Sequence, residues 1–170
     1  MFPSMTERTL VIVKPEHFGL TDLLVEELAQ HGTVVERAAV LAVHRDVVAE
    51  HYAVHRERPM IYERLVRQFE ARPVAVVVYE GDSVIQKIRD AIGPTEPVQG
   101  LQHQLRRRWS DDTYEKAAAE DRALRNVVHA SDSRESYERE YSVWEKFLCY
   151  PVFSLHPIRS FNVLHLSTKK

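Results

Sequence analysis

The chain has 170 residues, of which 44% are hydrophobic and 28% charged, with a formal net charge of −2. This composition is typical of a globular domain with its own core and gives no general attraction to nucleic acid. The single cysteine excludes an internal disulfide, and no stretch holds the about 18 uninterrupted apolar residues that cross a membrane. The opening MFPSMTERT lacks the layout of a signal peptide. We therefore expect one domain over residues 1–170, in a reducing, cytoplasmic setting and without a membrane partner.

The first elements alternate between short apolar runs and segments with helical spacing. TLVIVKP, residues 9–15, predicts a buried strand that ends at Lys14, because proline follows. Residues 19–32 predict a helix with Thr21 as its N-cap and a glycine as its C-terminal stop. The run over residues 33–45 predicts a second strand.

Two helices and a strand follow in the middle of the chain. Residues 46–57 and 60–71 have helical patterns, and Pro59 separates them. PVAVVVYEG, residues 73–81, is the most β-rich run of the sequence. Residues 82–93 then place their valine and isoleucines on one face, which predicts a helix.

The periodic pattern weakens after this helix. Residues 93–122 hold prolines, a glycine and a basic cluster, and they predict a long irregular excursion. RNVVHASDS, residues 125–133, predicts a strand. A helix over residues 131–147 follows, with Asp132 and Glu135 at the spacing of a capping box.

The order of these elements predicts the fold. The tail is expected to add a strand in SFNVLHL, residues 160–166. The order β-α-β-α-α-β-α-loop-β-α, with four central strands, fits an α/β sandwich of the ferredoxin-like type, in which helices cover a four-stranded antiparallel sheet.

His129 is the first candidate for chemistry, because it follows the apolar NVV at a predicted strand end. A histidine in a strand is more often only packed, and no set of neighbours has the spacing of a metal site. The catalytic interpretation is a nucleophile or an acid/base, since imidazole is largely neutral near pH 7 and keeps a free lone pair. Its other nitrogen then needs an acceptor. Glu140, two turns into the next helix on the face of Ser133, is a candidate.

No glycine-rich phosphate loop is present, because the five glycines are scattered along the chain. A bound phosphate would have to be held by side chains, and Lys14, Arg89 and Arg106 are the cations with suitable placement. For any single cation, solvated surface charge is the simpler explanation. RRRW, residues 106–109, is also a candidate nucleic-acid patch, and the net negative charge counts against that partner.

Five blocks of the sequence together resemble one enzyme family. ERTLVIVKP, EHYAVHRERP, PVAVVVYEG, IRDAIGPTEP and RNVVHASDS occur in the order and near the spacing of the blocks of nucleoside diphosphate kinases. The likeness runs from about Glu7 to Phe147, and N-x-x-H-x-S-D is its most specific motif.

This resemblance implies a ping-pong phosphotransferase. The γ-phosphate of a nucleoside triphosphate such as ATP would pass to a histidine nitrogen and then to a nucleoside diphosphate. Mg²⁺ would be bound through the nucleotide phosphates, with no metal-ligating residue of the chain. The resemblance also implies a homo-oligomer built from dimers.

The resemblance assigns roles residue by residue. His129 matches the phosphorylated residue, Glu140 the acid that orients its other nitrogen, and Ser131 the serine beside it. Lys14 and Tyr52 match the pair near the transferred phosphate. The residues that match the nucleotide-binding positions are Arg89, Thr95 and Arg106 for the distal phosphates, Asn126 for the sugar, and Met60 for the base.

The sequence also departs from the family pattern. Met60 replaces an aromatic residue that stacks on the base, and Ala123 replaces a bulkier aliphatic residue on the other side. About ten residues are inserted within residues 110–122, and the tail over residues 148–170 is divergent. These departures leave open an alternative function, a catalytically weak nucleotide-binding or regulatory module of the same fold.

Overall fold

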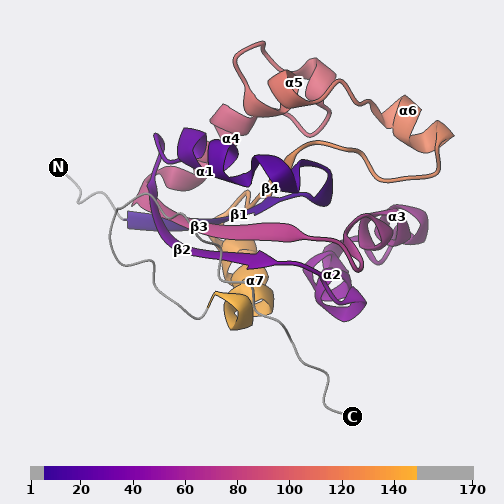
Figure 1. Cartoon of the computed structure of the whole chain (residues 1–170), viewed down its shortest axis with the longest axis horizontal. Coiled ribbons are helices and arrows are strands. Elements are labelled where there is room, and N and C mark those ends of the chain that lie inside the picture. Colours follow the sequence, from indigo (N-terminus) through magenta and orange to yellow (C-terminus); the bar gives the residue numbers. More distant parts are fainter. Residues whose placement is uncertain (1–5, 149–170) are drawn as a thin grey trace.

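The computed structural model describes residues 6–148, which form a sheet with helices on both faces (Figure 1). The strands are β1 (Thr6–Val13), β2 (Thr33–Val40), β3 (Val74–Asp82) and β4 (Val128–Ala130). Their order is β2-β3-β1-β4, and every neighbouring pair is antiparallel. The predicted ferredoxin-like α/β sandwich is confirmed.

The helices divide between the two faces of the sheet. One face is covered by α1 (Thr21–Leu28), α4 (Val84–Ile92) and α5 (Leu105–Trp109). The other face is covered by α2 (Arg45–His51), α3 (Pro59–Phe69) and α7 (Arg134–Trp144). The short α6 (Tyr114–Ala119) lies beyond α5, away from the sheet (Figure 1). Single 3-10 turns occupy Pro15–Leu20, Ala53–His55, Pro97–Gln99 and Glu145–Phe147.

Strand β1 lies inside the sheet and is buried on both faces. Leu10 and Ile12 join the core beneath α2, α3 and α7, whereas the valines that alternate with them join the core beneath α1 and α4. This two-sided burial explains why the strand reads as a continuous apolar run. The same alternation turns Lys14 toward the α2 and α7 face, and the antiparallel register pairs Ile12 with His129. The fold therefore brings both residues to one face.

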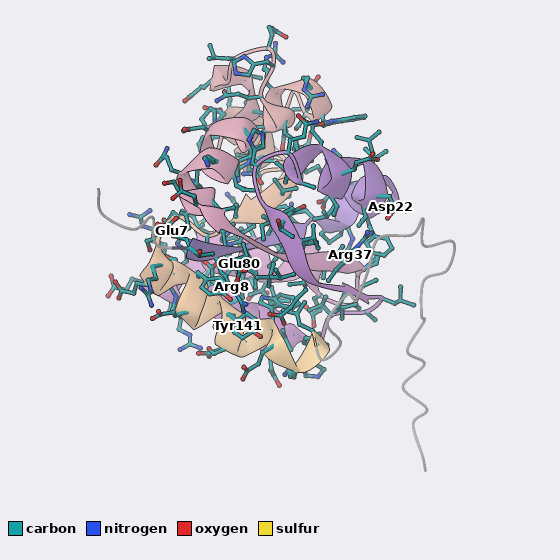
Figure 2. All side chains as sticks on the ribbon, turned by 90° about the vertical axis from the view of Figure 1, so that its left-hand side faces the viewer. Glu7, Arg8, Asp22, Arg37, Glu80 and Tyr141 are labelled. Carbon is teal, nitrogen blue, oxygen red and sulfur yellow. The ribbon has the colours of Figure 1, made fainter. Side chains whose placement is uncertain are left out.

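Side-chain contacts connect the strands with one another and with α7. Arg8 on β1 forms an ion pair of 2.7 Å with its register partner Glu80 on β3. The Tyr141 hydroxyl of α7 donates to the Glu36 carboxylate of β2, at 3.0 and 3.2 Å from its two oxygens. Figure 2 shows Tyr141 on the same side of the molecule as Arg8 and Glu80. Helix α7 is thus anchored across the sheet that carries His129.

Several predicted boundaries are wrong in detail. The helix predicted over residues 46–57 ends at His51, the strand predicted over 125–133 is limited to Val128–Ala130, and the helix predicted over 131–147 spans Arg134–Trp144. Helix α1 ends at Leu28, and Thr21 is its first residue, whose hydroxyl donates to the Phe18 carbonyl. Gly32 serves close packing, because an added Cβ would lie 2.5 Å from a Val84 methyl carbon. The second strand ends at Val40, since the chain enters α2 from residue 45.

The prediction of a long irregular excursion over residues 93–122 is wrong in part, because this segment contains a 3-10 turn, α5 and α6. These helices are only five and six residues long, too short for sequence periodicity to reveal. The capping box predicted from Asp132 and Glu135 is also wrong. Ser133 caps α7 by accepting from the Ser136 amide, while Asp132 accepts from the Ser136 hydroxyl.

Two further points concern the limits of the described chain. The strand predicted over residues 160–166, like the tail from residue 149, lies outside the described residues. Between residues 6 and 148, no helix has the length and apolar character that a bilayer crossing requires.

Candidate functional site

His129 lies on the short strand β4, where its side chain is 22% exposed. Its pairing with Ile12 directs the ring to the face covered by α2 and α7. The next helix begins at residue 134 and folds back across this face, so residues from both sides of the turn meet the ring. A partly accessible imidazole therefore lies on an edge strand of the sheet, where His129 is the middle residue of β4 and not its end.

The Glu140 carboxylate holds this imidazole in place. Its Oε2 lies 2.9 Å from His129 Nε2 and accepts a hydrogen bond of 2.7 Å from the Ser131 hydroxyl. Burial by itself raises the pKa of Glu140, but the charge that His129 carries when protonated and its hydrogen bond outweigh this effect and hold the pKa at about 2. An ionised carboxylate only accepts, so His129 Nε2 carries the proton and Nδ1 keeps its lone pair.

His51 is a site residue that the sequence interpretation missed. Its side chain, 4% exposed, packs edge to face against His129 with ring centroids 4.7 Å apart. Trp144 Nε1 donates to His51 Nδ1 at 3.2 Å, which leaves the His51 proton on Nε2. Burial, followed by the charge of His129, lowers the pKa of His51 to about 3. Helical spacing could have indicated that His51 is buried, because it shares the buried face of α2 with Val47 and Val48.

Within residues 6–148, His51, His129 and Glu140 place their ligand atoms within 4.8 Å of one another, which is compatible with a metal ion. The Trp144 bond opposes this use, because an N–H donor on Nδ1 forces the His51 proton onto Nε2. A histidine ligand needs the opposite arrangement, with one nitrogen free for the metal and an acceptor at the other. The hydrogen bond from Trp144 therefore fixes the proton of His51 on Nε2 and leaves His51 without a nitrogen free to bind a metal.

Lys14 is 4% exposed and directly follows β1. Its Nζ donates to Gln68 Oε1 at 3.3 Å and lies 5.7 Å from the centre of the Phe69 ring. Burial, followed by the charge of Arg106, lowers the pKa of Lys14 to about 7. A bound anion would therefore stabilise the charged form of Lys14.

Arg106 is 3% exposed and belongs to the short helix α5. Its guanidinium donates to the carbonyls of Gly93, Asn126 and Val128, at 2.9, 3.1 and 2.8 Å. Burial, followed by the charge of Arg89, lowers the pKa of Arg106 to about 10. Two arginines are thus close enough to interact, and Arg106 fixes the backbone on both sides of Val127.

Asn126 connects this backbone to the segment after α4. Its Nδ2 donates to the Thr95 carbonyl at 2.9 Å. Its Oδ1 is buried and has no hydrogen-bond partner among the described residues. A buried acceptor without a partner is costly, and a ligand hydroxyl would satisfy it. The amide is therefore suited to the predicted sugar contact.

Tyr52 is 6% exposed, and its ring centre lies 6.4 Å from that of His129. Burial, followed by the charge of Glu140, raises the pKa of its hydroxyl, which stays protonated and able to donate. Met60, at the start of α3, is 68% exposed, whereas Ala123 is 8% exposed. The structure brings Tyr52 to the histidine and leaves Met60 on the surface.

Helix α3 is tied to the segment that carries Ala123. Arg64 and Arg67 form ion pairs with Asp121, at 2.9 and 3.1 Å. These ion pairs connect the helix that begins near Met60 with the segment that leads to Ala123. Arg64 follows Met60 by one helical turn, so a guanidinium lies near the predicted base position.

The basic run over residues 106–109 does not form a free cationic patch. Arg106 is buried against carbonyls, and Arg108 forms an ion pair with Glu27 of α1. Two of the three arginines are therefore engaged within the fold, which further weakens the nucleic-acid hypothesis.

Comparisons with known proteins agree with this geometry. The family model for nucleoside diphosphate kinase matches residues 7–147. A nucleoside diphosphate kinase of Pyrococcus horikoshii is 32% identical over 145 residues, which cover 84% of this chain and 87% of the relative. One of Archaeoglobus fulgidus is 34% identical over 140 residues, covering 81% and 85%. This chain also shares its fold with a solved structure from Borrelia burgdorferi, which is described as a transition state mimic of nucleoside-diphosphate kinase with bound vanadate and ADP. The TM-score is 0.78 and the sequence identity 24%, and the match covers 85% of this chain and 91% of the other. The chain therefore belongs to the nucleoside diphosphate kinase family, a family of phosphotransferases.

Proposed function

We propose that this protein transfers the γ-phosphate of a nucleoside triphosphate, such as ATP, to a nucleoside diphosphate through a phosphohistidine at His129. One observation carries the proposal: His129 Nε2 lies 2.9 Å from the buried Glu140 carboxylate. That contact keeps the proton on Nε2 and leaves the Nδ1 lone pair available as a nucleophile.

In the first half-reaction, the Nδ1 lone pair forms a bond to the γ-phosphorus as the bond to the bridging oxygen breaks. The nucleoside diphosphate leaves with the electron pair of the broken bond. The ring gains positive charge, which Glu140 offsets through the proton on Nε2. In the second half-reaction, a terminal oxygen of another nucleoside diphosphate attacks the phosphorus, and the Nδ1–P bond breaks. The imidazole then returns to its starting state.

The cations of the site supply positioning and charge. Lys14 and Tyr52 are assigned to the transferred phosphoryl group, Arg89 and Thr95 to the distal phosphates, and Asn126 to the sugar. Arg106 is also assigned to the distal phosphates: three of its five N–H donors are bound to backbone carbonyls, which leaves two for a phosphate. Phosphoryl transfer needs little protein chemistry beyond a nucleophile, so alignment and electrostatic stabilisation account for most of the barrier reduction.

We propose Mg²⁺ as the cofactor, carried by the nucleotide phosphates. The donor set supports this assignment, because the residues assigned to the phosphates are cations and hydroxyls, while Glu140 already binds His129 and Ser131. When bound, Mg²⁺ neutralises charge that develops on the phosphate oxygens. No side chain of the chain is assigned as its direct ligand.

Incubation with γ-labelled ATP tests the proposal. We expect an acid-labile, base-stable phosphoprotein whose label moves to added nucleoside diphosphate, and no label on the His129→Ala variant. Nucleotide binding by the wild type without label would instead support the alternative, a nucleotide-binding or regulatory module. The exposed Met60, in place of an aromatic residue, is the observation that favours this alternative.

We further propose that the chain forms a single domain and a cytoplasmic homo-oligomer built from dimers. The position of β2 at a sheet edge supports self-association, because an edge strand offers unpaired backbone groups to a second copy. The single cysteine in 170 residues is consistent with a reducing compartment. Light scattering after size-exclusion chromatography measures the mass of the assembly, and a monomeric mass would refute the oligomer.

A further inference from the structure

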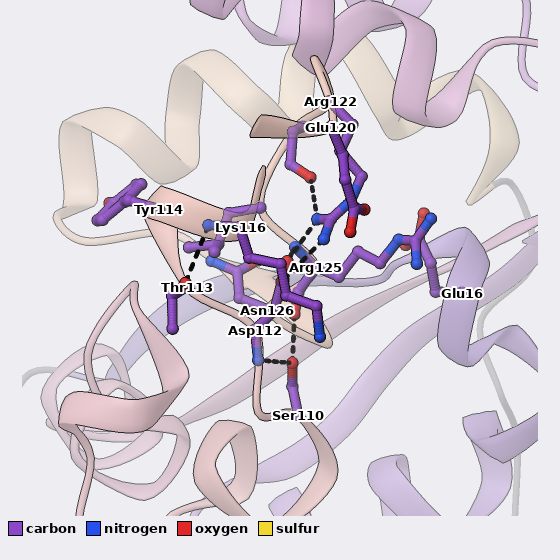
Figure 3. A network of polar contacts seen from close by, with 12 residues as sticks. Glu16, Ser110, Asp112, Thr113, Tyr114, Lys116, Glu120, Arg122, Arg125 and Asn126 are labelled. Carbon is purple, nitrogen blue, oxygen red and sulfur yellow. Dashed lines mark hydrogen bonds and ion pairs between the residues drawn. The ribbon is translucent and has the colours of Figure 1, made fainter. Parts of the chain in front are cut away.

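The inserted segment over residues 110–122 folds back onto the backbone that leads into β4 (Figure 3). The Ser110 hydroxyl donates to the Arg125 carbonyl at 2.6 Å. The Arg125 amide donates to Asp112 Oδ2 at 2.8 Å. Both backbone groups of Arg125 are therefore bound by side chains from the start of the insertion.

Asp112 is held in turn by the end of the insertion. Arg122 donates to both of its carboxylate oxygens, at 2.5 and 2.8 Å (Figure 3). Burial would raise the pKa of Asp112, but the hydrogen bonds from Arg122 and from the Arg125 amide outweigh it and hold the pKa at about 2. Asp112 is 4% exposed, so this bidentate pair is better shielded from water than an ordinary surface ion pair.

The backbone beyond Arg125 adopts an uncommon conformation. Val127 has φ 70°, a region that a β-branched residue rarely occupies. The Val128 amide donates to the Asn126 carbonyl at 2.8 Å, which closes a tight three-residue turn. Such a turn persists only where the surrounding structure holds it. Arg106 holds one side of it through the carbonyls of Asn126 and Val128.

We propose that Asp112 is a positioning residue for nucleotide binding. Together with Arg122 it fixes the Arg125 amide, and so holds the turn that presents the Asn126 side chain. The inference rests on the proposed function, because it assigns the Asn126 amide to the sugar of the nucleotide. It gives the insertion a role: the insertion replaces a short connection with a clamp that holds one binding residue.

The first test compares two variants that alter different partners of Arg122. Asp112→Asn removes the buried charge, whereas Glu120→Gln alters the 2.5 Å bond from Arg122 to a carboxylate that is 49% exposed. We expect Asp112→Asn to raise the KM for nucleoside diphosphate about tenfold, with kcat within about twofold, since a charged hydrogen bond is lost. Glu120→Gln should leave both constants within about twofold, because an exposed pair contributes little. Equal KM values for the two variants would overturn the proposal.

A double-mutant cycle shows whether Asp112 acts through Asn126. If it does, Asp112→Asn in an Asn126→Ala background raises the KM no further, because the residue that it positions is already absent. Multiplicative effects on the KM would overturn the proposal. If Asp112→Asn fails to fold, Ser110→Ala serves instead. It keeps the Asp112–Arg122 pair and removes the Ser110 hydroxyl, which donates to the Arg125 carbonyl and accepts from the Asp112 amide at 3.2 Å. We then expect a KM increase of about threefold that disappears in the same background.

Hydrogen exchange separates this inference from the proposed function. The Arg125 amide should exchange faster in Asp112→Asn than in the wild type or in Glu120→Gln, whether or not the protein transfers phosphate. Unchanged exchange would overturn the inference and leave the proposed function standing. A wild type that forms no phosphohistidine would overturn the proposed function, even if the Arg125 amide responds.

Discussion

The contact between His129 and Glu140 gives the sharpest prediction about the chemistry. Glu140→Gln keeps the shape of the side chain and removes the charge that fixes the proton on His129 Nε2. The glutamine can also donate from its amide, which favours the other tautomer and places the proton on Nδ1. We therefore expect slower formation of the phosphoenzyme, with the fold retained.

The magnitude follows from the bonds of one carboxylate oxygen. Glu140 Oε2 accepts from His129 at 2.9 Å and from Ser131 at 2.7 Å, in a setting that is 5% exposed. Loss of a charged hydrogen bond costs about 1.5–3 kcal/mol, which corresponds to a rate about 10- to 150-fold lower. Ser131→Ala removes one donor and keeps the charge, so we expect a loss of about 1 kcal/mol, or about fivefold.

Rapid-quench measurement of labelled phosphoenzyme, at saturating γ-labelled ATP and in a single turnover, isolates this step. The expected order of rates is wild type, then Ser131→Ala, then Glu140→Gln, with no label on His129→Ala. Circular dichroism checks that each variant is folded. The reasoning is refuted if folded Glu140→Gln reacts at the wild-type rate, or if it reacts faster than Ser131→Ala.

Three further predictions concern the base, the buried lysine and the core behind the histidine. Met60→Phe should lower the nucleotide KM about 2- to 10-fold with little change in kcat, because an aromatic contact contributes about 0.5–1.5 kcal/mol. An unchanged KM in steady-state assays would contradict the assigned base contact. Lys14 has a pKa of about 7 in the folded protein, so it loses its charge as the pH rises through 7, and the KM should rise between about pH 6 and pH 9. Lys14→Arg should flatten that profile, since arginine stays charged, and an identical slope would contradict it. Trp144→Phe should lower the free energy of unfolding in urea by about 2–4 kcal/mol, because it leaves a gap and removes the donor to His51; a loss under about 1 kcal/mol would contradict this role.

The strands and long helices could be predicted because each repeats a pattern over many residues. The two-sided burial of β1 and β3 appears as uninterrupted apolar runs, and α4 shows its buried face in its spacing. Helices α5 and α6 are five and six residues long, too short for a helical pattern of apolar residues to repeat, so the sequence does not predict them. The N-terminus of α7 was misassigned, because serines and acids follow one another and only the backbone geometry selects Ser133 as the cap.

Several site contacts were also open to prediction from the sequence. The alternation of side chains in β1 and the position of the turn after β4 place Lys14 and His129 on one face, and Glu140 follows at helical spacing. The five matched sequence blocks supplied the roles of Tyr52 and the nucleotide-binding residues, which no local pattern indicates.

The sequence by itself therefore determined the order of the strands and of the longer helices and the family, and it offered Glu140 as a candidate partner of His129. Only the tertiary structure decided that His51 and Trp144 lie behind that histidine, that Arg106 binds three backbone carbonyls, and that the insertion closes on Arg125 through Asp112. The physical reason is distance along the chain. Local periodicity reports which face of an element is buried, whereas these contacts join residues far apart in sequence, and their geometry depends on how whole elements pack.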